Sequence, residues 1–300
     1  MANAITSLTD TIISNAAIQA FTDAIAPLTA FARNVSPEAA ARGDKVKVLS
    51  TPAQDAAIDF VPATGYTMQD ADADGLDVSI DKHKFVSWGL TDTELSKNPQ
   101  LNIEEFGQQK GFQLAKAVLQ DIWSIITLAN YGAAAFVGAA GAFDADDVVD
   151  ISAACDAASW PEMNRSLILS ATYHASLRKD NAVQDASAYG NADAIQRGGI
   201  NSLDTFSKLF KSNLVPANAQ NLVGFAAYPD ALLVAMRYLA PQEGNKYFQA
   251  APITDPNGSG FTIGFRDWYD ENLGQRRKVL ECVYGYLKGN GNGIKRMTSA

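Results

Sequence analysis

Hydrophobic and polar side chains alternate along two segments in the first third of the chain. Residues 45–50, KVKVLS, alternate between charged and apolar side chains, which is the period of a β-strand with two different faces. Residues 76–92, LDVSIDKHKFVSWGLTD, place most of their apolar side chains at even positions and most of their polar ones at odd positions. Lys82 and Lys84 interrupt the apolar face, and Phe85 interrupts the polar face. The pattern predicts a ribbon of two long strands.

The residues between these two arms are typical of a turn exposed to solvent. They include Pro52, Pro62, Gly65 and the acidic run 70–75, DADADG, which favour a loop over a buried strand. An isolated two-stranded ribbon is marginally stable in water. We therefore expect another subunit to cover the ribbon, while its acidic tip stays in water.

Apolar residues recur at helical spacing before the ribbon. Along residues 5–31 they follow in steps of three and four, which predicts an amphipathic helix. We expect the helix to break near Ser14 and Asn15 and to end at the proline-containing segment 27–37. A single apolar stripe needs a partner surface, so this segment is predicted to be an arm that docks on something else.

A second helical stripe follows the ribbon. Asn102 and Glu105 have the spacing of a capping box, which marks a helix start. A helix over residues 103–129 would be roughly 40 Å long at 1.5 Å per residue, a length that suits a structural strut. One face of it carries Ile103, Phe106, Leu114, Val118, Ile122, Ile125 and Ala129.

Beyond Gly141 the patterns of helices and strands alternate, which indicates an α/β region. We expect helices over 144–158, 205–213 and 229–239, with a further helix starting after the buried strand 165–172. The remaining predicted elements are loops over 181–202 and 241–260, strands over 221–228, 261–270 and 276–288, and a flexible Gly/Asn-rich tail.

Composition and charge exclude several classes of protein. The 300 residues are 47% hydrophobic and 19% charged, which is ordinary for one large or two modest globular domains. A net charge of −9 argues against a dedicated nucleic-acid binder, and the group Arg276–Lys278 is interpreted as solvated surface. The apolar run 127–143 is too rich in Ala and Gly to predict a membrane span, the N-terminus does not resemble a secretory signal, and two isolated cysteines fit a reducing cytosol.

The candidate chemistry is sparse. The two histidines, His83 and His174, do not suffice for a zinc site or a histidine-based triad, and no nucleotide-binding or hydrolase motif is present. His83 and Asp81 share the polar face of a predicted strand, where we expect them to face water rather than a metal. No catalytic, cofactor or metal site is predicted.

A calcium loop is the one metal motif that calls for comparison. The acidic positions of an EF-hand loop are matched by Asp70, Asp72, Asp74, Gly75 and Asp81. Asp77 stands where the motif has an apolar residue, the last ligand is the shorter Asp, and the flanks do not predict helices. We therefore favour an acidic hairpin tip over a calcium site.

The order of these parts resembles the major capsid proteins of tailed bacteriophages, which share the Hong Kong 97-like fold. The resemblance covers nearly the whole chain and depends on order and spacing rather than on one signature. The phrases that carry it are SWGLTDTELS at 87–96, RSLILSATYHASLRKD at 165–180 and FTIGFRDWYDENLGQRRKVLECVYGYLK at 261–288.

This resemblance implies an α+β fold with named parts. The chain is divided into an N-terminal arm (1–42), an extended β-hairpin or E-loop (43–92), a peripheral domain with a long spine helix (93–143), an axial α/β domain (144–258), and closing strands shared by both domains (259–300).

The resemblance also implies a structural, non-enzymatic role. Family members form pentamers and hexamers of an icosahedral head in the virion, assembled in the host cytoplasm with a portal, and they contact packaged DNA non-specifically. Nothing in this sequence before the arm resembles a fused scaffolding segment, which implies a separate scaffolding protein or a trimmed chain.

Four residues are candidates for the assembly interface. They are Lys82, Lys84, Phe85 and Trp88, and either lysine is a candidate for the Lys–Asn cross-link that some family members form. The alternative is a soluble α/β enzyme or binding protein with a cleft in residues 144–250.

Overall fold

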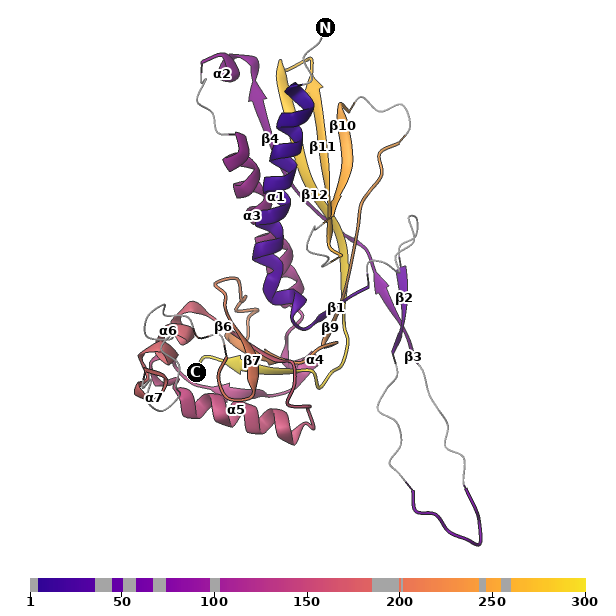
Figure 1. Cartoon of the computed structure of the whole chain (residues 1–300), viewed down its shortest axis with the longest axis vertical. Coiled ribbons are helices and arrows are strands. Elements are labelled where there is room, and N and C mark those ends of the chain that lie inside the picture. Colours follow the sequence, from indigo (N-terminus) through magenta and orange to yellow (C-terminus); the bar gives the residue numbers. More distant parts are fainter. Residues whose placement is uncertain are drawn as a thin grey trace.

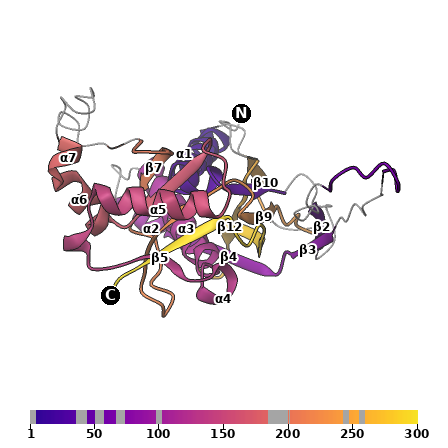
Figure 2. The ribbon, with the colours of Figure 1, turned by 90° about the horizontal axis from the view of Figure 1, so that it is seen from below.

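The computed structural model describes residues 5–35, 45–50, 58–66, 74–97, 103–184, 200, 202–242, 247–254 and 260–300. Within these ranges the chain forms two sheets with helices packed on them, and a ribbon that projects away from both (Figures 1 and 2). The predicted α+β class is confirmed.

The first sheet is built around β12 (Gln275–Lys288), its longest strand. β11 (Thr262–Asp270) and β4 (Lys82–Thr91) pair antiparallel with opposite edges of its first part, since Leu280 is opposite both Phe265 and Val86. β9 (Leu232–Arg237) pairs with the last part of β12, β10 (Gln249–Thr254) with β11, and β1 (Ala32–Asn34) in parallel with β9.

Two long helices cover one face of this sheet. α1 (Ile5–Thr29) and α3 (Ile103–Trp123) lie side by side (Figure 1). Their backbones approach so closely that a Cβ at Gly107 would lie only 2.8 Å from the carbonyl oxygen of Ile13. The main core lies between the two helices and the sheet, and it includes Phe21, Ile25, Val118, Ile122, Phe265 and Tyr284.

The second sheet has the strand order β5-β13-β8-β6-β7. A second core between it and the helices α5 and α6 includes Val148, Ile151, Leu167, Phe206 and Met297. The strands are β5 (Ala134–Val137), β6 (Arg165–Leu169), β7 (Phe206–Lys211), β8 (Leu222–Ala227) and β13 (Ile294–Thr298), and the helical segments are α4 (Leu128–Tyr131), η2 (Ala140–Ala142), α5 (Ala145–Ala157), α6 (Ala171–Lys179) and α7 (Asn181–Gln184).

The ribbon consists of β2 (Lys45–Ser50) and β3 (Asp74–Ser79), paired antiparallel. The predicted return arm is divided at residues 80–81, because β3 pairs with β2 whereas β4 belongs to the first sheet. A short helix, α2 (Asp92–Lys97), follows β4.

Several predicted elements differ from the structure. α1 runs through Ser14 and Asn15 without a break, because packing against α3 outweighs their weaker helix propensity. α3 ends at Trp123 rather than near residue 129. Directly after Trp123, Ser124 donates a hydrogen bond to the carbonyl oxygen of Asp121 and the chain turns.

The largest errors exchange helices for strands. The predicted helices over 205–213 and 229–239 are the strands β7 and β9. β9 is apolar along nearly its whole length because both of its faces are buried, and such a run has no period that separates a strand from a helix. The predicted loop 241–260 contains β10, and the predicted flexible tail forms β13, which pairs with β5 and β8.

Candidate assembly surfaces

The side chains of β4 alternate as predicted, with even positions turned toward the interior and odd positions toward solvent. Lys82, on the inner face, donates hydrogen bonds to a carboxylate oxygen of Asp121 (2.9 Å) and to the hydroxyl of Tyr286 (2.8 Å). Tyr284 donates to the same Asp121 oxygen at 2.7 Å. Partial burial opposes ionisation of Asp121, but the hydrogen bonds from Lys82 and Tyr284 outweigh it and lower the pKa of this carboxyl below its ordinary value. Lys82 therefore ties β4 to α3 and β12 within its own subunit.

The other three predicted interface residues divide between the two faces of β4. Lys84 donates a hydrogen bond to the carbonyl oxygen of Ala117 in α3 (3.0 Å), and Trp88 is partly buried against the main core. Phe85 points the other way and is 62% exposed. The structure thus brings Lys82 and Lys84 together on α3, packs Trp88 against the main core, and leaves Phe85 on the outside. A role of these four residues between subunits stays a prediction.

The outer face of the first sheet has an open depression of about 450 Å³ beside Phe85. Its lining includes Trp268, Arg277 and Val279 from β11 and β12. On the same face, Glu281 accepts hydrogen bonds from Arg266 (2.7 Å) and lies 3.1 Å from Nε2 of His83. The side chain of His83 is 43% exposed, so it faces solvent as predicted, and it also lies beside Glu281.

The root of the ribbon is covered by its own chain, which corrects the expectation that another subunit covers it. The inward side chains of β2 and β3 pack on β9 and β12, and Val78 is fully buried. This small core consists of Val35, Val46, Val48, Val78, Ile80, Leu233, Ala235 and Val283.

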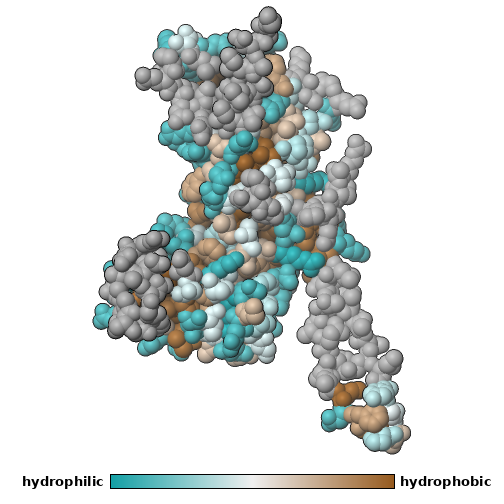
Figure 3. All heavy atoms as spheres, viewed as in Figure 1, coloured by the Kyte–Doolittle hydropathy of each residue, from teal (hydrophilic) through white to brown (hydrophobic). Residues whose placement is uncertain are grey.

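The far end of the ribbon is apolar rather than acidic. The chain turns at residues 61–65, where Val61 and Gly65 form a β-bridge and Gly65 has a φ of 67°. Phe60 and Tyr66 face each other across this turn, with ring centroids 4.8 Å apart, and they are 56% and 90% exposed. Figure 3 shows brown and tan spheres at this end, far from the rest of the chain.

The described part of the acidic run 70–75 lies in a strand and not in the turn of the hairpin. Asp74 and Gly75 begin β3, opposite Ser50 and Leu49 of β2, and positions 70–73 lie outside the described residues. Among the residues that the structure describes, no group of three or more His, Cys, Asp and Glu side chains could hold a metal ion. The described residues therefore offer no support for a calcium loop, which the sequence analysis had already disfavoured.

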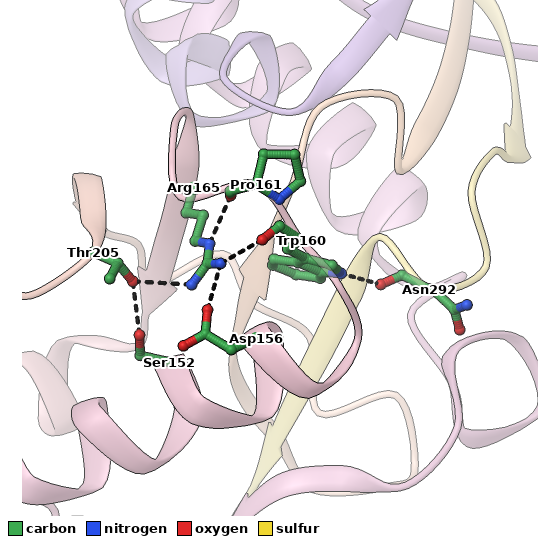
Figure 4. Close-up of polar contacts among 7 residues, drawn as sticks. All are labelled: Ser152, Asp156, Trp160, Pro161, Arg165, Thr205 and Asn292. Carbon is green, nitrogen blue, oxygen red and sulfur yellow. Dashed lines mark hydrogen bonds and ion pairs between the residues drawn. The ribbon is translucent and has the colours of Figure 1, made fainter. Parts of the chain in front are cut away.

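A buried arginine lies at one end of the second sheet (Figure 4). Arg165 has no exposed surface and donates hydrogen bonds to Asp156, Thr205 and the carbonyl oxygens of Trp160 and Pro161. These contacts join the end of α5 to the starts of β6 and β7. Nε, Nη1 and Nη2 of Arg165 all donate hydrogen bonds within the chain. The cluster therefore stabilises this part of the fold rather than presenting a reactive group.

Two further features of the helices bear on the sequence analysis. The described helices include none that is both long and apolar enough to cross a membrane. Asn102 lies outside the described residues, but α5 has a complete capping box formed by Asp144 and Asp147.

Sequence reasoning missed the residues that fix the ribbon. Asp121 lies outside the predicted apolar stripe, and Tyr284 and Tyr286 belong to the predicted strand 276–288 without any further distinguishing pattern. The signal that could have found the contact point is Gly285, which interrupts the apolar strand VYGYL, because a glycine inside a strand often marks a close backbone approach.

Comparisons with known proteins identify the fold. No family model and no curated protein matches the sequence. A solved structure from Mycobacterium phage Che8 matches with 19% identity and a TM-score of 0.57, covering 86% of this chain and 85% of that one. The mature capsid of bacteriophage PhiM1 matches with 10% identity and a TM-score of 0.60, covering 90% and 85%. The chain has the Hong Kong 97-like capsid fold.

The same fold extends beyond phages. A virus-like particle from Pyrococcus furiosus matches with 12% identity and a TM-score of 0.53, covering 95% of this chain and 97% of that one. The capsid-like arrangement predicted from the order of the sequence elements is thus confirmed as a fold across nearly the whole chain.

Proposed function

We propose that this chain is the major capsid protein of a tailed bacteriophage, which self-assembles into pentamers and hexamers of an icosahedral head around double-stranded DNA. The observation that carries the proposal is the apolar tip of the ribbon at residues 58–66. Phe60 and Tyr66 are exposed at the end of an element that projects away from its own subunit. Only another molecule can bury them, and apolar surface of this kind marks an interaction site.

The same proposal assigns roles to the predicted interface residues. Phe85 and the depression beside it, on the outer face of the first sheet, bind a neighbouring subunit. Lys82 and Lys84 act indirectly, because they hold β4 on α3, and Trp88 does so by packing against the main core. A Lys–Asn cross-link through either lysine would require its present hydrogen bonds to break.

The partners follow from the role. The closed shell needs a portal, and a separate scaffolding protein would direct its assembly in the host cytoplasm. The net charge of −9 suits a shell whose contacts with packaged DNA are non-specific and weak.

Electron microscopy and sedimentation of the purified chain at rising concentration test this function. We expect rings, sheets or closed shells. A compact small particle at every concentration would contradict the proposal and favour the alternative of a soluble enzyme or binding protein with a cleft in residues 144–250.

A virus-like particle that does not carry a phage genome is the second candidate. The match to the Pyrococcus furiosus particle favours it, because that comparison covers almost the full length of both chains. The contents of particles purified from the native source separate the two: double-stranded DNA supports a phage head, and a protein cargo supports the second candidate.

A further inference from the structure

The ribbon leaves the first sheet by crossing over β12. Val283 and Tyr284 pair with β4 and also with β9, so these two strands occupy opposite edges of β12. The ribbon continues directly from β4, yet its apolar face packs on Leu233 and Ala235 of β9. The chain must therefore pass across β12 between residues 82 and 78.

Gly285 is the point at which the two backbones meet. A Cβ at this position would overlap the carbonyl oxygen of Ser79 and lie 2.7 Å from its carbonyl carbon and 3.0 Å from Cα of Ile80. These are backbone atoms, which cannot rotate away as a flexible side chain can. Any other residue at 285 has to lift the root of the ribbon off the sheet.

Lys82 holds the same junction from the opposite face of the sheet. It is the last residue of the strand ladder before the crossing, opposite Tyr284. Its ammonium group bonds to Asp121 and Tyr286, which turns its side chain toward α3. The crossing is thus fixed by a close backbone contact on the outer face and by a polar cluster on the inner face.

We propose that Gly285 and Lys82 are positioning residues that set the direction in which the ribbon leaves the subunit. The apolar tip is then presented at a fixed angle before any neighbour binds. The consequence for assembly rests on the proposed function, whereas the direction itself is a property of the single subunit.

Distances between spin labels on unassembled subunits test the direction. We would place the labels at Ala63→Cys in the tip and Gln113→Cys on α3, which are both exposed, whereas the native Cys155 and Cys282 are buried. Gly285→Ala should shift the tip-to-α3 distance relative to the labelled parent protein and should abolish shells of normal size.

Gly75→Ala is the matched control. It makes the same substitution in β3 of the same ribbon, where the nearest atoms to the new Cβ belong to the flexible side chain of Lys47. We expect unchanged label distances and normal assembly. Equal distances in Gly285→Ala and the parent would overturn the proposal.

Lys82→Met keeps the proposal testable if Gly285→Ala does not fold. We expect it to broaden the distribution of label distances, because one of the two anchors is lost. Lys84→Met, two residues further along the same face, should leave the distribution narrow. A narrow, unshifted distribution in Lys82→Met would contradict the assigned role of Lys82.

The label distances also separate this inference from the proposed function. If the parent protein never forms shells but Gly285→Ala still shifts the tip, the capsid role fails and the positioning role stands. If the parent forms shells and neither Gly285→Ala nor Lys82→Met changes the distances, the positioning role fails alone.

Discussion

The two ends of the ribbon differ in what covers their apolar side chains. At the root, Val46 and Val78 are opposite each other and are buried on β9 and β12 of the same chain. At the tip, Phe60 and Tyr66 also pair across the ribbon, but both are exposed. The root therefore contributes to the stability of the subunit, whereas the tip is available to a partner.

One hairpin can therefore stabilise its own subunit at the root and bind a neighbouring subunit at the tip. Burying an apolar side chain contributes about 1.5–3 kcal/mol, so the root can hold the ribbon without a neighbour. The tip forgoes that stabilisation in the isolated subunit and would gain it on assembly. Stability and assembly should thus respond separately to mutations at the two ends.

Val78→Asp is expected to have the largest effect. It would place a charge in the fully buried core at the root, which should lower the free energy of unfolding by several kcal/mol. Ser79→Asp is the control, because the next side chain along β3 is exposed. Thermal unfolding measures both, and a Val78→Asp protein as stable as the control would show that the root is not a core.

Asp267→Asn, in β11 of the first sheet, should have the next largest effect. Asp267 is fully buried and accepts hydrogen bonds from Arg276 and Lys278. Removing its charge leaves both cations without this carboxylate, which should cost roughly 3 kcal/mol. Denaturant unfolding at neutral pH measures the loss. If the variant were as stable as the parent, the other contacts of the two cations would suffice to hold the sheet.

The lowered pKa of Asp267 should also make the stability of the protein depend on pH. Burial opposes its ionisation, but hydrogen bonds from Arg276 and Lys278 outweigh burial and hold its pKa below the ordinary 3.8. Its contribution is therefore complete above the unfolded-state value and is lost as the pH falls through the lower folded-state pKa. Melting temperatures measured down to about pH 2 should fall more steeply for the parent protein than for Asp267→Asn.

Replacing residues 52–73 with a short Gly/Ser linker should have a small effect on stability and a large one on assembly. The replacement keeps β2 and β3 and the buried Val78, which a replacement extending to residue 78 would remove. Changing loop length costs well under about 1 kcal/mol per doubling, so the subunit should fold. We expect no shells by electron microscopy, and normal shells would show that the tip is dispensable.

The double substitution Phe60→Ser and Tyr66→Ser should change stability least. Both side chains are exposed, and such changes alter the free energy of unfolding by about 0.5 kcal/mol or less. The concentration needed for assembly should nevertheless rise about tenfold or more, which corresponds to 1.4 kcal/mol. Phe112→Ser, at a half-exposed aromatic of α3, is the control and should assemble at the parent concentration.

The sequence predicted the elements whose side chains have a clear period. The alternation along residues 82–91 and the helix predicted over 144–158 correspond to the observed β4 and α5. The helix predicted at β9 was wrong because both faces of this strand are buried and its side chains show no period. The flexible tail predicted at β13 was wrong because its Gly and Asn residues are typical of a tail. Both errors concern strands whose place is decided by neighbours far away in the sequence.

The candidate surfaces were harder to predict than the fold. The family resemblance made Lys82 a candidate for a bond between subunits, yet its partner is Asp121 of the same chain, 39 residues away, and no local pattern links the two. The acidic run drew attention to the wrong part of the hairpin, because composition favours a turn there while the chain turns at residues 61–65. Pairing register is a long-range property, so the break between β3 and β4 was not visible in one strand alone.

Hydrogen exchange on unassembled subunits and on assembled particles tests most directly whether the root is held within the subunit and the tip between subunits. Amides of residues 74–80 should be protected equally in both states, because β3 pairs with β2 and packs on its own chain. Amides of residues 58–66 should exchange rapidly in the free subunit and become protected in the particle. Equal exchange of the tip in both states, or protection of the root only after assembly, would contradict this division.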